Sequence, residues 1–197
     1  MMYPLVMCSL IALGVMIAKV YTLVVADRNT RKVLSEVEAF AEEGKITEAI
    51  KVAVARPGPA AAILVVGLRR ISHGDEGKEL SDAIKTTGTI ELGFLERGLV
   101  ILATIANVAP LMGFLGTVVG MIIAFASIEA AGDVDPTLVA GGIKVALLTT
   151  ATGLLIAIPV NIGYNFFVTK IDHLIMQMEI GAQKVLDIAY TYGSATK

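Results

Sequence analysis

The feature that most constrains this chain is a set of three long runs that are nearly free of charge. The first covers residues 3–26 and is interrupted only by Lys19. The second, residues 98–128, and the third, residues 145–169, carry no charged side chain. A transmembrane α-helix needs about 20 consecutive, predominantly apolar residues. The sequence therefore predicts an all-α integral membrane protein with three transmembrane helices.

The remaining charge is concentrated in one block. Only 17% of the residues are charged and 55% are hydrophobic, whereas soluble domains carry about 25% charged residues. Residues 27–97 hold most of the charged side chains. We expect the second and third spans to extend into a helical bundle that this block forms. The predicted organisation is transmembrane helix 1–26, cytoplasmic helical domain 27–97, transmembrane helix 98–128, external loop 129–135, transmembrane helix 136–169 and cytoplasmic C-terminal helix 170–197.

Charges next to the spans predict their orientation. Basic side chains gather on one side of the predicted membrane: Arg28, Arg31, Lys32, Arg97 and Lys170. The loop 129–135 carries three acids and no Lys or Arg. Cytoplasmic loops hold an excess of Lys and Arg, so we expect an outside N-terminus and a cytoplasmic C-terminus. No convincing cleavage site follows the first run, which we interpret as an uncleaved signal anchor.

Glycine and proline divide the charged block into short helices. Apolar spacing predicts a helix over residues 30–43 that Gly44 stops, followed by helices over residues 46–55 and 60–71. From Lys78 a further helix is expected. It can run straight into the second span, despite the glycines Gly88, Gly93 and Gly98.

Residues for catalysis or metal binding are scarce. His73 and His173 are far apart in the chain and lack acidic or cysteine companions at metal-ligand spacing. Cys8 is the single cysteine, and no phosphate-binding glycine loop of the Walker type occurs. We expect no enzymatic activity and no cofactor, which disfavours the alternative of an enzyme or redox protein in the bilayer.

Small residues recur on one face of the second and third spans. At intervals of three and four residues, which share a helical face, the second span places Ala109, Gly113, Gly116, Thr117, Gly120 and Ala124. The third places Gly142, Ala146, Thr149, Thr150, Gly153 and Ala157. Such stripes allow close helix packing. Proline stands inside both spans, at Pro110 and Pro159, where it frees a backbone carbonyl and favours a kink.

Two interpretations of these spans remain open, helix packing and a pore lining. Thr149, Thr150 and Thr152 cluster at depth, with Thr117 on the other span and Asn161 and Asn165 towards the cytoplasmic end. Polar groups in hydrocarbon favour a wet cavity or a partner. The three spans contain no Asp or Glu, and threonine does not titrate. If protons cross here, the protonated residue must come from another chain.

Two segments resemble a known family. The sequence APLMGFLGTVVG over residues 109–120 is similar to the second-span signature of the MotA/TolQ/ExbB proton-channel family. The sequence ALLTTATGLLIAIP over residues 146–159, followed by Tyr164 and Asn165, resembles its third-span signature. The stretch 95–97 and the three-span layout also fit, and they are closest to the ExbB/TolQ branch.

The resemblance implies a homopentamer around the single-span helices of an ExbD/TolR-like partner, two copies per pentamer. The partner would supply a membrane aspartate, and Thr117 and Thr150 match the family threonines that face it and help conduct H+. The residues implied in pore or helix packing are Gly113, Gly116, Gly120, Thr149, Gly153, Pro110 and Pro159. The implied location is the bacterial inner membrane, and the implied role is to drive an envelope process such as outer-membrane transport with the proton motive force.

The chain departs from the family pattern at the outer end of the third span. Five residues before the third-span threonine, where ExbB has a glutamate, this chain has Val145, preceded by Lys144. These two residues are therefore the candidates for an altered outer access to the path. A non-conducting membrane scaffold and a sodium-driven or motility stator of the same family are the alternative functions.

Overall fold

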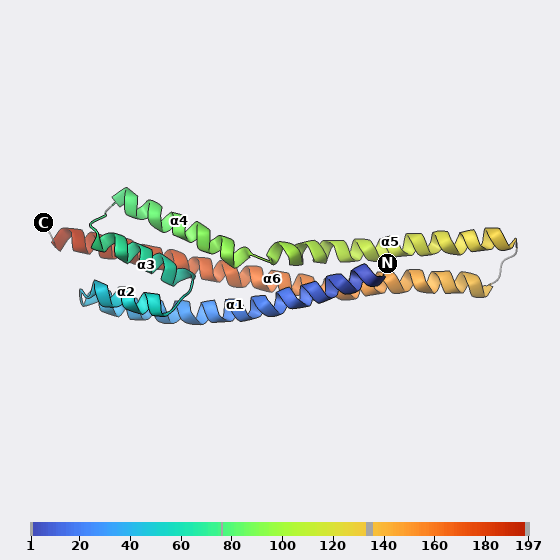
Figure 1. Ribbon diagram of the computed structural model, residues 1–197, viewed down its shortest axis with the longest axis horizontal. Helices are drawn as coiled ribbons and strands as arrows, with labels where there is room; N and C mark the ends of the chain where they lie inside the picture. Colours follow the sequence, from blue (N-terminus) through green and yellow to red (C-terminus); the bar gives the residue numbers. More distant parts are fainter. Residues whose placement is uncertain (1, 76, 133–135, 196–197) are drawn as a thin grey trace. The chain divides into compact units, whose positions relative to one another are not determined.

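Six helices make up the part of the chain that the structure describes. The computed structural model describes residues 2–75, 77–132 and 136–195, and within these ranges it contains no strand. The helices are α1 (Met2–Glu42), α2 (Ile46–Ala55), α3 (Pro59–Ser72), α4 (Gly77–Glu96), α5 (Leu99–Ala131) and α6 (Pro136–Ala195) (Figure 1). The predicted all-α class is confirmed.

Three stretches of these helices suit a membrane. In the described part of the chain, stretches within Met2–Ala41, Gly77–Ala130 and Val139–Tyr190 are long and apolar enough to cross a bilayer. They correspond to α1, α5 and α6, so the chain is a membrane protein with three candidate spans. Residues 133–135 of the predicted loop 129–135, which include two of its acids, lie outside the described residues.

The structure corrects two predicted helix boundaries. The helix predicted over 30–43 is not separate, because α1 continues without interruption from the first span to Glu42. Its predicted stop is confirmed, since Gly44 adopts a φ of +72° and its N–H donates to the Ala41 carbonyl at 3.0 Å. The prediction that one helix continues from Lys78 into the second span is wrong, because the helix breaks at Gly98. That residue has a φ of +90°, so α4 ends at Glu96 and α5 begins at Leu99.

The chain forms two compact units. Unit 1 comprises residues 1–19 and 98–166, and unit 2 comprises residues 20–97 and 167–197. Both α1 and α6 contribute to each unit. The predicted third span and C-terminal helix are therefore consecutive parts of one helix, α6.

Unit 2 has an ordinary hydrophobic core. Fully buried side chains from four of its helices include Val33, Ala49, Leu64 and Leu80. Helix α3 packs against α2 and α4, and Pro59 stands at its first turn, where a missing N–H costs nothing.

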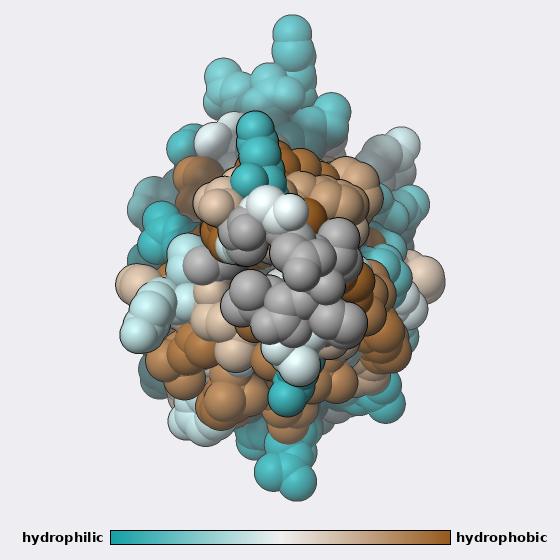
Figure 2. Space-filling model, turned by 90° about the vertical axis from the view of Figure 1, so that its right-hand side faces the viewer, coloured by the Kyte–Doolittle hydropathy of each residue, from teal (hydrophilic) through white to brown (hydrophobic). Residues whose placement is uncertain are grey.

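Unit 1 is built differently, because small residues fill its centre. Ala109, Ala124, Ala146 and Ala157 are buried, as are Leu5 and Ala12 of α1. Large hydrophobic side chains point outward instead, and hydrophobic surface surrounds the end of the α5–α6 pair in Figure 2. The exposed hydrophobic residues near the end of α5 and the start of α6 include Ile122, Ile123, Phe125, Val145, Leu147 and Leu148. Apolar surface of this extent requires lipid or other protein chains around it.

Candidate ion-conducting site

The centre of unit 1 is a close contact between α5 and α6. The two helices run antiparallel (Figure 1). A Cβ atom on Gly120 would lie 2.8 Å from the Ala146 Cβ, and one on Gly142 would lie 2.5 Å from the Ala124 Cβ. Real Cβ atoms do not approach neighbours this closely, so these positions accept only glycine without movement. The small-residue stripes predicted from sequence thus face each other.

The contact is tightest where backbone meets backbone. A Cβ on Gly153 would lie 2.6 Å from the Ala109 carbonyl oxygen and 3.1 Å from the Gly113 Cα. A Cβ on Gly113 would lie 3.0 Å from the Thr150 Cα. Van der Waals packing at this distance is the main attraction between helices in lipid. It fixes α5 and α6 as one pair.

The threonines of α6 occupy different places in this pair. Thr149 is buried at 4% exposure against Gly116, and its hydroxyl donates to the Ala146 carbonyl at 2.7 Å. Thr150 is half-buried, and its hydroxyl donates across to the Gly113 carbonyl of α5 at 2.9 Å. Thr149 therefore has a packing role. Thr150 joins the two helices and also reaches the surface of the pair.

Thr117 lies on the same flank of the pair as Thr150. Each follows directly after a contact residue, Gly116 on α5 and Thr149 on α6. One residue is a rotation of about 100° around a helix, and because the helices are antiparallel the two rotations lead to the same side. Thr117 is also half-buried. We call the surface around Thr117 and Thr150 the threonine flank.

The hydroxyls of the threonine flank are already used as donors. Thr117 donates to the Phe114 carbonyl at 2.6 Å and Thr150 to the Gly113 carbonyl at 2.9 Å. A hydroxyl has one donor and two acceptor lone pairs, so what each still offers is an acceptor. An arriving protonated carboxyl can donate to such an oxygen, whereas an ionised carboxylate has nothing to donate. The flank therefore suits a neutral carboxyl better than a charged one.

The prolines do not interrupt either span. Pro110 lies inside α5 and Pro159 inside α6, and both helices continue through them. Pro110 is half-buried and stands next to the contact residue Ala109, whereas Pro159 is exposed. Each removes one N–H from its helix, which leaves a carbonyl one turn earlier without its usual donor.

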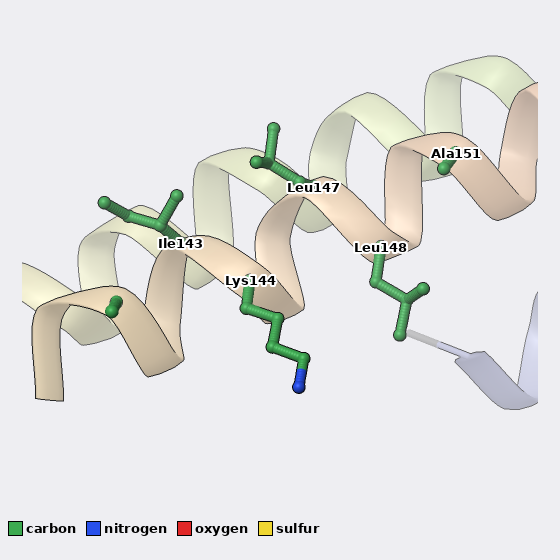
Figure 3. A pocket seen from close by; sticks show the side chains of 6 residues that line it. Ile143, Lys144, Leu147, Leu148 and Ala151 are labelled. Atoms are coloured by element: carbon green, nitrogen blue, oxygen red, sulfur yellow. The ribbon is translucent and has the colours of Figure 1, made fainter. Parts of the chain in front are cut away.

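Lys144 and Val145 lie away from the threonine flank. Lys144 lines a shallow groove of about 590 Å³ on α6, together with Ile143, Leu147, Leu148 and Ala151 among others (Figure 3). At about 100° per residue, Lys144 is rotated roughly 120° from Thr150. Val145 is 59% exposed. The Lys144 ammonium is the only charged group in the lining of this groove, and the other lining side chains are aliphatic.

Among the polar residues of the α5 span that were overlooked in the sequence, Asn107 carries an amide. Asn107 is exposed, and its amide donates to the Ala103 carbonyl at 2.9 Å. Its amide side chain in an otherwise apolar run is the signal that could have identified it. The exposed Asn161 and Asn165 of α6 provide further amides in unit 1.

Comparison with known proteins identifies the family to which the chain belongs. A family model described as the MotA/TolQ/ExbB proton channel family matches residues 55–180, which is well over half of the chain. The chain belongs to the MotA/TolQ/ExbB proton channel family. The matched range contains α3, α4, α5 and most of α6, and thus both sides of the glycine contact. The resemblance found in the sequence is confirmed.

Individual relatives carry the name ExbB. A protein of Methanothermobacter thermautotrophicus, named as an ExbB homolog, is 32% identical over 152 residues, which is 77% of this chain and 53% of the relative. The biopolymer transport protein ExbB of Aquifex aeolicus is 41% identical over 85 residues, 43% of this chain and 57% of its own. That of Xanthomonas campestris is 35% identical over 126 residues, 61% of this chain and 50% of its own. The chain spans about half the length of these curated relatives.

Proposed function

We propose that this chain is the ring-forming subunit of a proton-driven motor, in which it surrounds the single-span helix of an ExbD/TolR-like partner. The proposed ring is a homopentamer in a bacterial inner membrane, with two partner helices inside. The N-terminus would lie in the periplasm and the C-terminus in the cytoplasm. The proposed output is movement of the partner, which would drive an envelope process such as outer-membrane transport.

The observation that carries this proposal is the threonine flank. It offers two hydroxyl oxygens as acceptors within spans that contain no Asp or Glu of their own. A proton path through a membrane normally contains a titratable group. A partner carboxyl facing Thr117 and Thr150 would supply that group, and the two oxygens would favour its protonated form.

The energy of one proton is sufficient for a step. A unit charge that moves through 100 mV releases about 2.3 kcal/mol. Neutralising the partner carboxyl removes the cost of moving a charge past exposed apolar side chains such as Phe114 and Leu154. The glycine contact between α5 and α6 would keep the wall stiff while the partner moves.

We propose no enzymatic step and no cofactor other than the translocated ion. Few side chains of α5 and α6 within unit 1 are titratable, and the proposed role of the chain is to surround and position the partner helix. Lys144 and Val145 would form the outer access, where Val145 stands at the position of the family's glutamate and Lys144 precedes it. The ammonium group of Lys144 would repel incoming cations, so proton delivery along this face of α6 should be slow.

Reconstitution tests the proposed function. The chain is placed in liposomes with and without an ExbD/TolR-like single-span protein, a membrane potential is applied, and the internal pH is followed with a dye. We expect proton flux only when both proteins are present. Flux that requires Na⁺ would favour the sodium-driven alternative, and a tight complex without any flux would favour the non-conducting scaffold.

A further inference from the structure

A group of polar side chains in unit 2 has no role in the proposed function. There α1 and α6 pack in parallel. A Cβ on Gly181 would lie 3.3 Å from the Leu34 Cδ2, and Glu38 forms an ion pair with Lys184. In the turns of α1 and α6 that precede this contact, the facing side chains are polar. We call the group Asp27 and Thr30 from α1, with His173 and Gln177 from α6, the polar layer.

The four side chains of the polar layer lie close together. The His173 Nε2 is 3.9 Å from the Asp27 Oδ1 and 3.0 Å from the Gln177 amide nitrogen. Thr30 lies one turn after Asp27, and Gln177 lies one turn after His173. Because the helices are parallel and Asp27 is level with His173, Thr30 and Gln177 are also at one level.

The polar layer is partly buried, since the Asp27 and His173 side chains are 28% and 42% exposed, and its acceptors are incompletely used. Thr30 is fully buried and Gln177 is 9% exposed. The Asp27 Oδ1, the Thr30 Oγ1 and the Gln177 Oε1 are each buried without a hydrogen-bond partner among the described residues. An unsatisfied buried polar group destabilises the fold. The layer therefore gains from any change that supplies a donor or a positive charge.

Protonation of His173 would supply both. A neutral imidazole has one N–H donor, whereas the imidazolium has two. With a second N–H, the Nε2 can donate to the Gln177 oxygen once that amide has turned over. The new positive charge would also face the Asp27 carboxylate. One proton thus satisfies an amide oxygen and adds a cation beside a carboxylate whose other cation among the described residues is Arg31, with its Nε 3.5 Å away.

Other charges near the polar layer are engaged or exposed. On α6, Asp172 and Lys170 flank His173 in sequence and are exposed. The connection between α2 and α3 approaches α1 at Asn29, whose amide donates to the Pro57 carbonyl at 2.9 Å. Its charged neighbour Arg56 forms an ion pair with Glu36 at 2.7 Å. Asp27 is therefore the acid that responds most directly to a charge on His173.

We propose that the polar layer is a proton-binding site that latches α1 to α6. Uptake of a proton by His173 strengthens the α1–α6 contact, and its release loosens it. Imidazole changes charge between about pH 5 and 8, so the latch responds to the pH on the side of the membrane where unit 2 lies. The proposal does not depend on the ion path, because all four residues belong to unit 2 and the threonine flank belongs to unit 1.

Hydrogen exchange on the full chain in lipid nanodiscs tests this latch. Protection of residues 27–37 is measured from pH 8 to pH 5.5 after correction for intrinsic exchange rates. The imidazolium can donate to the Gln177 oxygen a charge-assisted hydrogen bond that the neutral ring does not make, so we expect protection to rise about tenfold as the pH falls. H173Q should abolish this rise. H73Q, which changes the exposed second histidine, should retain it.

Asp27→Asn and Asp172→Asn form a matched pair, because each removes one acid next to His173. Asp27→Asn should weaken the rise and Asp172→Asn should leave it intact. An equal response in this pair would overturn the proposal, even if H173Q failed to fold. An unchanged rise in folded H173Q would also overturn it. So would a tenfold change caused at constant pH by replacing Na⁺ with N-methylglucamine, because the layer would then hold a metal cation.

Discussion

Replacing Gly153 with alanine should separate α5 from α6. The added Cβ would lie 2.6 Å from the Ala109 carbonyl oxygen and 3.1 Å from the Gly113 Cα. Both neighbours are backbone atoms of a continuous helix, so neither can move aside as a side chain would. The helices must move apart by several tenths of an ångström, and the hydrogen bond from Thr150 to the Gly113 carbonyl must lengthen with them.

The magnitude follows from two opposing terms. Alanine is about 1 kcal/mol better than glycine inside a helix. Overpacking of a closely packed contact costs typically 1–3 kcal/mol, and the strained hydrogen bond adds about 0.5–1.5 kcal/mol. The net loss expected for Gly153→Ala is about 1–3 kcal/mol. Gly141→Ala is the matched control on the same helix, because a Cβ there would meet nothing within 4 Å. It should be neutral or stabilise by up to about 1 kcal/mol.

Steric-trapping or denaturant unfolding in bicelles, at fixed protein concentration, measures both variants. The reasoning predicts that Gly153→Ala and Gly141→Ala change the free energy of unfolding in opposite directions. If both changed it equally, the α5–α6 backbone contact would not determine stability. The account of unit 1 would then be wrong.

Two further substitutions test other parts of the structure. Gly67→Ala should lower the stability of unit 2 by about 1–3 kcal/mol, because its Cβ would lie 3.1 Å from the Val185 Cγ2. In equilibrium unfolding, adding Val185→Ala to this variant should restore most of the lost stability. If stability were not restored, the contact between Gly67 and Val185 would be wrong. Gly98→Ala should cost about 1–3 kcal/mol, because a φ of +90° strains an L-residue; thermal unfolding in detergent checks this, and an unchanged melting temperature would mean that the α4–α5 connection differs.

The sequence predicted features that depend on local spacing. The helix over residues 46–55 was predicted with the bounds of α2, because Gly44 and Pro57 stop the chain on both sides. The stripes containing Gly113 and Gly153 were predicted to allow close approach, and they do. Periodicity suffices for these features, since a helical face is determined by residues three and four apart.

Features that depend on tertiary contacts were missed. The break at Gly98 follows from a positive φ that an isolated glycine in an apolar run does not reveal. The Asp27–His173 contact joins residues far apart in the chain, so spacing cannot show it. Nor could the sequence separate the roles of Thr149 and Thr150, because adjacent hydroxyls look alike until the partner helix places one inside the contact and the other across it.

The central claim is that the hydroxyl oxygens of the threonine flank accept the proton of a partner carboxyl. Proton flux in liposomes that contain the chain and its partner tests it directly, with Thr150→Val compared with Thr150→Ser, which retains a hydroxyl of the same reach. The account predicts that Thr150→Val and Thr117→Val each reduce the flux at least tenfold, since about 1.4 kcal/mol corresponds to a factor of ten, and that Thr150→Ser retains most of it. Equal flux in Thr150→Val, Thr117→Val and the unsubstituted chain would contradict the claim.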